Sequence, residues 1–295
     1  MALRDYLAGE VAQDFADGLL TRREALRRLG LLGLSLTGAS ALLAGCGDDD
    51  DDEAATLPTS PATTGRPAGE DQADVIRFRG PTGELQAAYA APGRTKASLV
   101  VIHENRGLTP HFHDLVRRFG GEGFAALCVD LLSSEGGTAS LTDPARAPAA
   151  LSAAPMDRLL ADLRAGIDEL QRRTPGPKVG AVGFCFGGGM TWNLLQAGEA
   201  RLAAAAPFYG PAPENPDFSR ARAAVLAVYG ELDARVNATR DRAKAALEAA
   251  GLPHEIRTFA GADHAFFNET GPRYNPQAAR EAYQALLQWF NRYLV

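Results

Sequence analysis

The chain has 295 residues, 46% of them hydrophobic and 22% charged, an ordinary composition for a globular protein with a sizeable core. Its formal net charge of −6 comes from one acidic run, Asp48 to Glu53, because the rest of the chain is balanced in charge. This balance excludes a nucleic-acid partner, which needs a concentrated basic patch. The three cysteines are too few for a disulfide scaffold.

Residues 1–46 have the pattern of an export signal. Arg22 and Arg23 form a twin arginine ahead of an apolar run, 29–44, of about 16 residues, shorter than the roughly 20 needed to cross a bilayer. The run ends in Leu-Ala-Gly-Cys46, which resembles a lipobox, whose cysteine is lipidated and becomes the new N-terminus. We therefore expect a twin-arginine lipoprotein signal that anchors the protein to a membrane at its periplasmic or extracytoplasmic face. The alternative is a buried core helix with a chance cysteine.

The segment that follows, residues 47–73, combines the acidic run with Pro, Thr, Gly and Ala. Such a composition cannot bury enough apolar surface to fold. We expect a disordered spacer between the anchor and a folded domain at 74–295. Because a single acyl chain binds a bilayer only marginally, the expected diacylation of Cys46 would make the anchor firm.

Strand and helix patterns alternate through residues 74–295. Continuous or alternating apolar runs predict strands, and apolar residues three or four positions apart predict helices. The predicted strands are 75–78 and 85–91, which form a hairpin at a sheet edge, then 98–103, 124–129, 179–184, 202–208, 225–229 and 255–259. The predicted helices are 111–123, 156–173, 187–197, 240–250 and 276–294, and we expect 133–154 to be irregular. The alternation predicts one α/β domain with a mostly parallel sheet and helices on both faces.

Cys185 occupies a glycine-rich turn between the strand 179–184 and the helix that follows. Gly183 and Gly187 flank it in the spacing of a G-x-S-x-G nucleophile elbow, with cysteine in place of serine. The helix N-terminus favours a thiolate and a developing oxyanion. A phosphate-binding turn is the alternative, but the spacing is neither G-x-G-x-x-G nor that of a P-loop. A cysteine that only packs in the core is a second alternative.

An acid and a histidine follow in the order that an elbow of this kind requires. Asp233 comes just after the strand 225–229, and His264 just after the strand 255–259. Because ligands of open α/β sheets bind outside the carboxyl ends of the strands, these side chains can converge on Cys185. The sequence predicts a Cys185–His264–Asp233 triad. Glu231 is a rival for the acid, and a turn aspartate with a surface histidine is the alternative.

These residues resemble the dienelactone hydrolase family, the cysteine branch of the α/β-hydrolases. The resemblance extends from about Val75 to Val295 and rests on four segments: G-F-C-F-G-G at 183–188, Y-G-E-L-D at 229–233, G-A-D-H-A-F at 261–266 and H-E-N-R-G at 103–107. It implies an α/β-hydrolase fold and a carboxylic ester hydrolase similar to carboxymethylenebutenolidase, acting on a small ester or lactone without a cofactor.

The resemblance also implies roles for residues outside the triad. Glu104 matches a glutamate that contacts the thiol and accepts its proton when substrate binds, which would keep the nucleophile quiet until then. The backbone N–H groups of Asn105 and Phe186 would form the oxyanion hole. Tyr89 matches a tyrosine near the substrate pocket.

Two arginines that hold the substrate carboxylate in this family are missing. Ser134 and Asn268 occupy their positions. An unpaired buried carboxylate binds poorly, which puts the carboxylated lactone in doubt as a substrate. Arg106 and Arg273 could substitute from nearby loops.

Three further interpretations compete with a hydrolase. A thiol redox protein would need a resolving cysteine, but Cys128 lies in a predicted core strand and Cys46 in the lipobox. A non-catalytic binding module could use the same fold. A metal site on His111 and His113 lacks a third ligand in the sequence, so we expect no metal. The sequence does not fix the oligomeric state.

Overall fold

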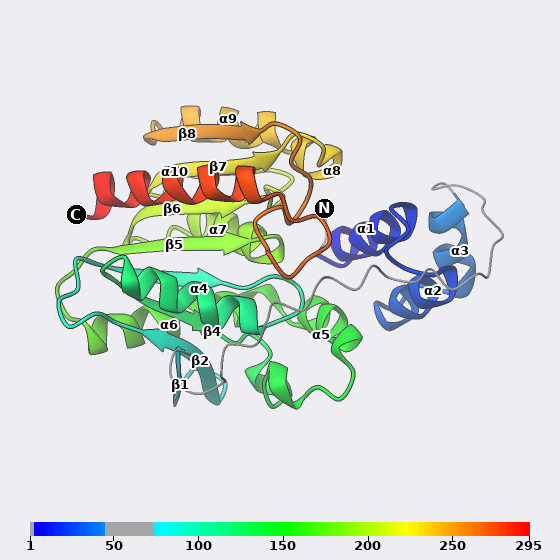
Figure 1. Cartoon of the computed structure of the whole chain (residues 1–295), viewed down its shortest axis with the longest axis horizontal. Helices are drawn as coiled ribbons and strands as arrows, with labels where there is room; N and C mark the ends of the chain where they lie inside the picture. The colour runs from blue at the N-terminus through cyan, green and yellow to red at the C-terminus, as the bar shows by residue number, and fades with distance from the viewer. Residues whose placement is uncertain (1–2, 45–72) are drawn as a thin grey trace. The chain divides into compact units, whose positions relative to one another are not determined.

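The computed structural model describes residues 3–44 and 73–295, which divide between two compact units (Figure 1). The described part of the first unit comprises residues 3–44 and 141–155, and that of the second comprises 73–140 and 156–295. Cys46 and the predicted spacer, apart from its last residue Ala73, lie outside the described residues.

The first unit is helical. Thr21 caps its second helix by accepting the N–H of Glu24 at 3.3 Å, and Glu24 in turn accepts from Arg28 at 2.7 Å. A turn at Gly33, with φ of 80°, divides the apolar run of the predicted signal between two helices. None of the described helices is both long and apolar enough to cross a membrane. The helices are α1 (Leu3–Ala16), α2 (Arg22–Leu31), α3 (Leu36–Ala44) and α5 (Ala147–Ala153).

The prediction that residues 133–154 are irregular is wrong in part. Residues 147–153 form α5, which begins with a proline in its first turn, where the missing N–H has no helical partner to lose. Short 3₁₀ turns precede it at Ser133–Glu135, Thr138–Ser140 and Pro144–Arg146. Within the first unit, Arg27 of α2 forms an ion pair with Asp143. The segment lacks helical periodicity because alanine forms much of it, so the sequence pattern gave no signal.

The second unit contains an eight-stranded sheet in the order β1-β2-β4-β3-β5-β6-β7-β8. β1 and β2 form the predicted antiparallel hairpin at one edge, and β2 also pairs antiparallel with β4. The remaining neighbours are parallel. The strands are β1 (Asp74–Arg79), β2 (Glu84–Ala90), β3 (Ala97–Ile102), β4 (Phe124–Val129), β5 (Val179–Phe184), β6 (Leu202–Phe208), β7 (Ala224–Gly230) and β8 (His254–Phe259).

Helices cover both faces of this sheet, as predicted for an α/β fold. Figure 1 shows α4 and α10 on one face and α6, α7 and α9 on the other. The ring centroids of Phe119 on α4 and Tyr283 on α10 lie 5.9 Å apart, so these two helices share a layer. The helices are α4 (Pro110–Gly121), α6 (Met156–Arg173), α7 (Phe186–Gln196), α8 (Ala234–Asn237), α9 (Arg240–Ala249) and α10 (Pro276–Leu294).

The central strands explain why the loops at the carboxyl ends of the parallel strands are held firmly. Every residue of β3, β4 and β5 is buried, as expected of parallel strands covered on both faces. At their carboxyl ends the ring of Phe184 lies 4.9 Å from that of Phe208 and 5.1 Å from that of Phe267. The loops that follow these strands therefore start from well-packed residues.

Candidate active site

Cys185 stands on the sharp turn between β5 and α7. Its φ of 55° and ψ of −117° are unusual for a residue other than glycine. A Cβ at Gly183 would lie 2.0 Å from the carbonyl oxygen of Gly187, and one at Gly187 would lie 2.2 Å from that of Ile102. A side chain larger than glycine would therefore clash with backbone at either flanking position. The N–H of Cys185 donates to the carbonyl of Phe208 at 3.0 Å, which ties the bend to β6.

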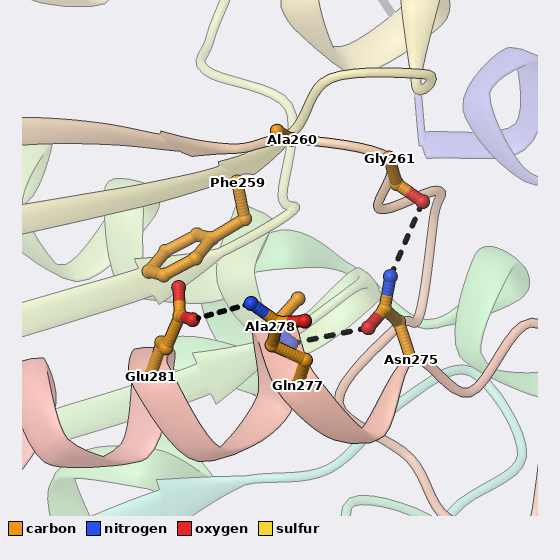
Figure 2. A pocket seen from close by; sticks show the side chains of 7 residues that line it. All are labelled: Phe259, Ala260, Gly261, Asn275, Gln277, Ala278 and Glu281. Atoms are coloured by element: carbon orange, nitrogen blue, oxygen red, sulfur yellow. Dashed lines mark hydrogen bonds between the residues drawn. The ribbon is translucent and has the colours of Figure 1, made fainter.

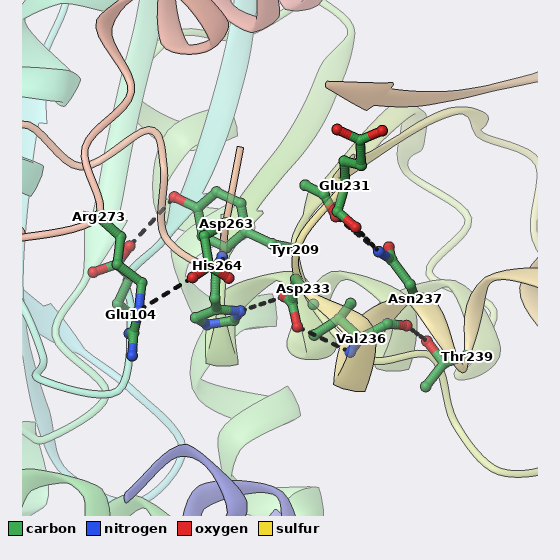
Figure 3. Close-up of polar contacts among 12 residues, drawn as sticks. Glu104, Tyr209, Glu231, Asp233, Val236, Asn237, Thr239, Asp263, His264 and Arg273 are labelled. Carbon is green, nitrogen blue, oxygen red and sulfur yellow. Dashed lines mark hydrogen bonds and ion pairs between the residues drawn. The ribbon is translucent and has the colours of Figure 1, made fainter. Parts of the chain in front are cut away.

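The structure brings Cys185, His264 and Asp233 together from three separate loops. Nδ1 of His264 lies 2.6 Å from Oδ2 of Asp233 (Figure 3). The Sγ of Cys185 and a ring nitrogen of His264 lie within 4.8 Å of each other. The backbone N–H of Val236 donates to the other oxygen of Asp233 at 3.1 Å and fixes the carboxylate at the start of α8.

Glu231, the rival for the acid, faces another group. Its exposed carboxylate accepts the backbone N–H of Gly261 at 2.8 Å. It therefore fastens the loop that carries His264 instead of contacting the imidazole itself.

Electrostatics in this group favour an ion pair. Burial opposes protonation of His264, but the nearby Asp233 and Cys185 side chains outweigh it and hold the pKa of His264 well above its usual value. Burial would raise the pKa of Asp233, but the attraction and hydrogen bond of His264 outweigh it, so this pKa is lowered. An imidazole in this position can accept the proton of the thiol, and the imidazolium that results can give the proton up again.

Glu104 lies in the same group, at the end of β3, with a buried carboxylate. Its Oε2 accepts from the Asn268 side-chain amide at 2.8 Å, and its Oε1 accepts from the hydroxyl of Tyr209 at 3.3 Å. Both donors are neutral. Asn268 thus stands at the position of a family arginine and contacts the glutamate.

Tyr209 was missed by the sequence analysis. It follows β6 with a φ of 35°, and its ring centroid lies 5.3 Å from that of His264 in an edge-on arrangement. Burial first, then the charges of Glu104 and Cys185, raise the pKa of its hydroxyl, so it stays a proton donor to Glu104. Its place just past the carboxyl end of a central strand, the criterion that selected Asp233 and His264, could have revealed it.

The two expected oxyanion-hole donors follow two different strands, β3 and β5. Asn105 follows Glu104 in a tight turn after β3, and Phe186 is the first residue of α7. The first N–H groups of a helix have no partner within it, which suits Phe186 to this role. Both positions belong to loops that also carry Glu104 or Cys185.

The three expected substrate-binding residues have different surroundings. The ring of Tyr89 lies under the guanidinium of Arg173, 5.0 Å from its centroid, at the end of α6 that leads back to the amino ends of the strands. The placement of Tyr89 beside the site is therefore corrected. Arg106 has an exposed side chain. Arg273 pairs with Asp263, next to His264, at 3.5 Å (Figure 3).

The histidines considered for a metal have protein partners in the structure. The His111 ring lies 2.9 Å from a carboxylate oxygen of Glu269, and the backbone of Ala73 opposes the effect of burial on the pKa of His113. Burial lowers the pKa of His113.

A surface pocket lies beside the loop that carries His264 (Figure 2). Asn275 caps α10 by accepting the N–H of Ala278 at 3.1 Å, and its amide donates to the carbonyl of Gly261 at 3.3 Å. The pocket's polar groups therefore hold the histidine loop against α10. It is lined by Phe259, Ala260, Gly261, Asn275, Gln277, Ala278 and Glu281.

Comparisons with known proteins identify the family. The profile of the Dienelactone hydrolase family matches residues 85–294. A Salmonella typhimurium protein named "Putative carboxymethylenebutenolidase" is 29% identical over 256 residues, which are 81% of this chain and 94% of that protein. One of the same name from Methylorubrum extorquens is 30% identical over 70% of this chain and 75% of its own length.

Solved structures show the same fold. The crystal structure of a protein described as "Putative Dienelactone Hydrolase", from Klebsiella pneumoniae, is 28% identical and matches with a TM-score of 0.64, covering 75% of this chain and all of that one. A dienelactone hydrolase from Anabaena variabilis matches with a TM-score of 0.60 at 20% identity, over 77% of this chain and all of that one. The second unit thus has the architecture of these proteins.

Proposed function

Because the chain belongs to the dienelactone hydrolase family and is a hydrolase of the α/β-hydrolase fold, we propose that it cleaves an ester or lactone by covalent catalysis with Cys185 as the nucleophile. His264 acts as the general acid and base, and Asp233 orients the imidazole and stabilises its protonated form. The observation that carries this proposal is the position of His264, whose ring lies 2.6 Å from the Asp233 carboxylate and has a nitrogen within 4.8 Å of the Cys185 sulfur.

The proposed reaction has two halves. In the first, the Cys185 thiolate forms a C–S bond with the acyl carbon, and the carbonyl electron pair moves onto oxygen, where the N–H groups of Asn105 and Phe186 stabilise it by about 3 kcal/mol per donor. The C–O bond then breaks, and His264 gives its proton to the leaving alkoxide. In the second half His264 takes a proton from water, the resulting hydroxide attacks the thioester, and the C–S bond breaks to release the acid.

Glu104 is proposed to control when the thiol reacts. Its carboxylate lies in the group that contains Tyr209 and Cys185, held by two neutral hydrogen-bond donors. A bound substrate that displaces this carboxylate would change the charge beside the sulfur. The thiol would then be activated only when an ester is present to be attacked. A thiol kept quiet between turnovers resists oxidation outside the cytosol.

The substrate is proposed to have an uncharged acyl group. Of the two positions where family members place arginines, Ser134 is exposed in a 3₁₀ turn and Asn268 is bonded to Glu104. A substrate carboxylate placed there would meet no cation from either position and would lie near the negative charge of Glu104. This separates the proposed substrate from the one that the names of the relatives suggest.

The function is tested by replacing the nucleophile. We expect Cys185→Ala to lower kcat/KM for a neutral aryl ester by on the order of 10⁴-fold or more, whereas Cys128→Ala, a change at the buried cysteine of β4, leaves it within about 3-fold. Mass spectrometry of His264→Ala treated with the ester should find a thioester on Cys185. Wild-type rates in Cys185→Ala would contradict the proposal.

We also propose that residues 1–46 direct export through the twin-arginine route, that Cys46 is lipidated and that 47–73 form a spacer. The ordered twin arginine, apolar run and Leu-Ala-Gly-Cys sequence support this. Arg22→Lys/Arg23→Lys should abolish export, whereas the matched pair Arg27→Lys/Arg28→Lys should not. Cys46→Ser should move the protein from the membrane fraction to the soluble fraction. Membrane attachment that survives Cys46→Ser would contradict the anchor.

A further inference from the structure

His103, which precedes Glu104, is a fully buried histidine that the proposed reaction does not use. Its Nδ1 lies 2.7 Å from the carbonyl oxygen of Glu104, and its Nε2 accepts the backbone N–H of Leu131 at 3.1 Å. Since Nε2 is an acceptor, the ring proton is on Nδ1, which donates to the Glu104 carbonyl. One imidazole thus joins the loop after β3 to the loop after β4.

The carbonyl that His103 binds belongs to the same peptide unit as the N–H of Asn105. All peptide bonds of the described residues are trans. In a trans peptide the C=O and N–H point in opposite directions, so a donor fixed on the carbonyl fixes where the N–H is aimed. The N–H of Gly107 also donates to this oxygen, at 3.1 Å, and closes the turn. The His103 ring and the N–H of Gly107 therefore both hold this peptide plane through its carbonyl oxygen.

His103 also contacts the start of α7, which carries Phe186, the second proposed oxyanion donor. Its ring is stacked on that of Phe186, with centroids 6.2 Å apart and planes at 24°. A Cβ at Gly187 would lie 2.7 Å from the carbonyl oxygen of His103, so the start of α7 is packed directly on this residue. The same side chain therefore touches both segments that carry the proposed oxyanion donors.

We propose that His103 is a positioning residue for the oxyanion hole, which aims the Asn105 N–H by holding the Glu104 carbonyl and sets its spacing from Phe186. The inference rests on the proposed function. It assigns His103 no contact with substrate and no proton transfer.

The environment keeps this imidazole neutral, as the role requires. Burial lowers the pKa of His103 against the opposing effect of Asp130. Protonation would turn Nε2 into a donor facing the N–H of Leu131, and the link between the two loops would be lost. Asp130 is itself bound by the N–H groups of Leu132 and Thr138 and by the Thr138 hydroxyl, which hold its carboxylate in place.

Two substitutions of His103 distinguish the roles of its two ring nitrogens. His103→Asn keeps a donor near the Nδ1 position, whereas His103→Gln keeps an acceptor near the Nε2 position. His254→Gln is the matched control, because the Nδ1 of His254 also lies 2.8 Å from a backbone carbonyl, that of Leu252, but at the amino end of β8. The full chain is assayed with a neutral aryl ester and with a trifluoromethyl ketone, which forms an oxyanion adduct with the thiol.

We expect His103→Gln to lower kcat about 10-fold or more and to weaken the ketone adduct by a similar factor, with KM within about 2-fold, since the oxyanion forms only after binding. His103→Asn should retain more of both, and His254→Gln should match the wild type. Alkylation of Cys185 by iodoacetamide, which forms no oxyanion, should be unchanged in all variants. Equal losses in both His103 variants, or a parallel loss of alkylation, would overturn the inference.

A measurement on the wild-type chain avoids substitution. On formation of the ketone adduct, the ¹⁵N–¹H signal of His103 Nδ1 should shift, because the peptide it binds becomes polarised by the oxyanion at its other end. An unshifted signal would overturn the inference. If Cys185→Ala hydrolyses the ester at the wild-type rate, the proposed function fails instead, and the comparison of the His103 variants remains separate from that result.

Discussion

The side-chain amide of Asn268 donates to the carboxylate of Glu104 over 2.8 Å and joins residues 164 positions apart in the sequence. Asn268 lies four residues beyond His264, so the loop that carries the imidazole also carries a contact to Glu104. A neutral donor here leaves the charge of Glu104 uncompensated. This contact supports the proposed preference for an uncharged acyl group, and three of the predictions below concern this group of residues.

Asn268→Arg should change which substrates are favoured. A guanidinium at this position can pair with a carboxylate, and a charge-assisted hydrogen bond contributes about 1.5–3 kcal/mol. We expect the ratio of kcat/KM for a carboxylated ester to that for its neutral analogue to rise about 10-fold or more. Asn268→Gln, which keeps a neutral amide, is the control. A ratio unchanged by the arginine would contradict the proposed basis of substrate choice.

Glu104→Gln tests the proposed control of the thiol. If the carboxylate controls the thiol, removing its charge should change how fast iodoacetamide alkylates Cys185 as a function of pH. The glutamine oxygen can still accept from Asn268, while its NH2 group faces the Tyr209 hydroxyl, whose oxygen can accept from it. Alkylation rates from about pH 5 to 10 provide the measurement. Identical profiles in wild type and variant would remove Glu104 from this role.

The charge on His264 should make stability depend on pH. Burial opposes this charge, but Asp233 and Cys185 outweigh it and raise the folded-state pKa of His264. A raised pKa contributes stability that is fully present below the unfolded-state pKa, about 6.5, and is lost as pH rises through the folded-state pKa. We expect the free energy of unfolding in urea to fall above about pH 6.5.

His264→Gln should remove this dependence, because glutamine does not titrate. His254→Gln should retain the wild-type slope, since that imidazole lies at the opposite end of the sheet. A slope that is the same in all three proteins would show that other groups control stability in this pH range.

Gly183, two residues before the proposed nucleophile, should not tolerate a larger side chain. Gly183→Ala would place a Cβ 2.0 Å from the backbone oxygen of Gly187, and backbone cannot move aside cheaply. We expect a loss of about 3 kcal/mol or more in the free energy of unfolding. Gly93→Ala is the control, because nothing lies within 4 Å of its Cβ position, and its effect should stay within about 1 kcal/mol. Similar unfolding curves for the two variants would contradict this account of the turn.

Much of the second unit could be predicted because its strands are buried on both faces. β3, β4 and β5 are continuous apolar runs in the sequence, and each strand was predicted within one residue of its bounds. The convergence of Cys185, Asp233 and His264 followed from one topological rule, since each lies just past the carboxyl end of a parallel strand.

The parts that were missed depend on contacts between distant loops. Tyr209 and Asn268 meet at Glu104 only because three loops converge, and no spacing in the sequence records that meeting. The helix α5 is short and rich in alanine, so it has no apolar periodicity to detect. Tyr89 was placed by resemblance alone, and its strand turns the ring toward Arg173.

The backbone at Cys185 restricts which nucleophilic side chains can occupy this bend. Its φ of 55° is strongly unfavourable for a branched Cβ, which excludes threonine, while serine has the same unbranched shape. Among hydroxyl and thiol side chains, cysteine and serine are thus the two that fit this backbone. A lineage built on this turn could exchange a soft nucleophile for a hard one by a single substitution, leaving every strand and helix where it was.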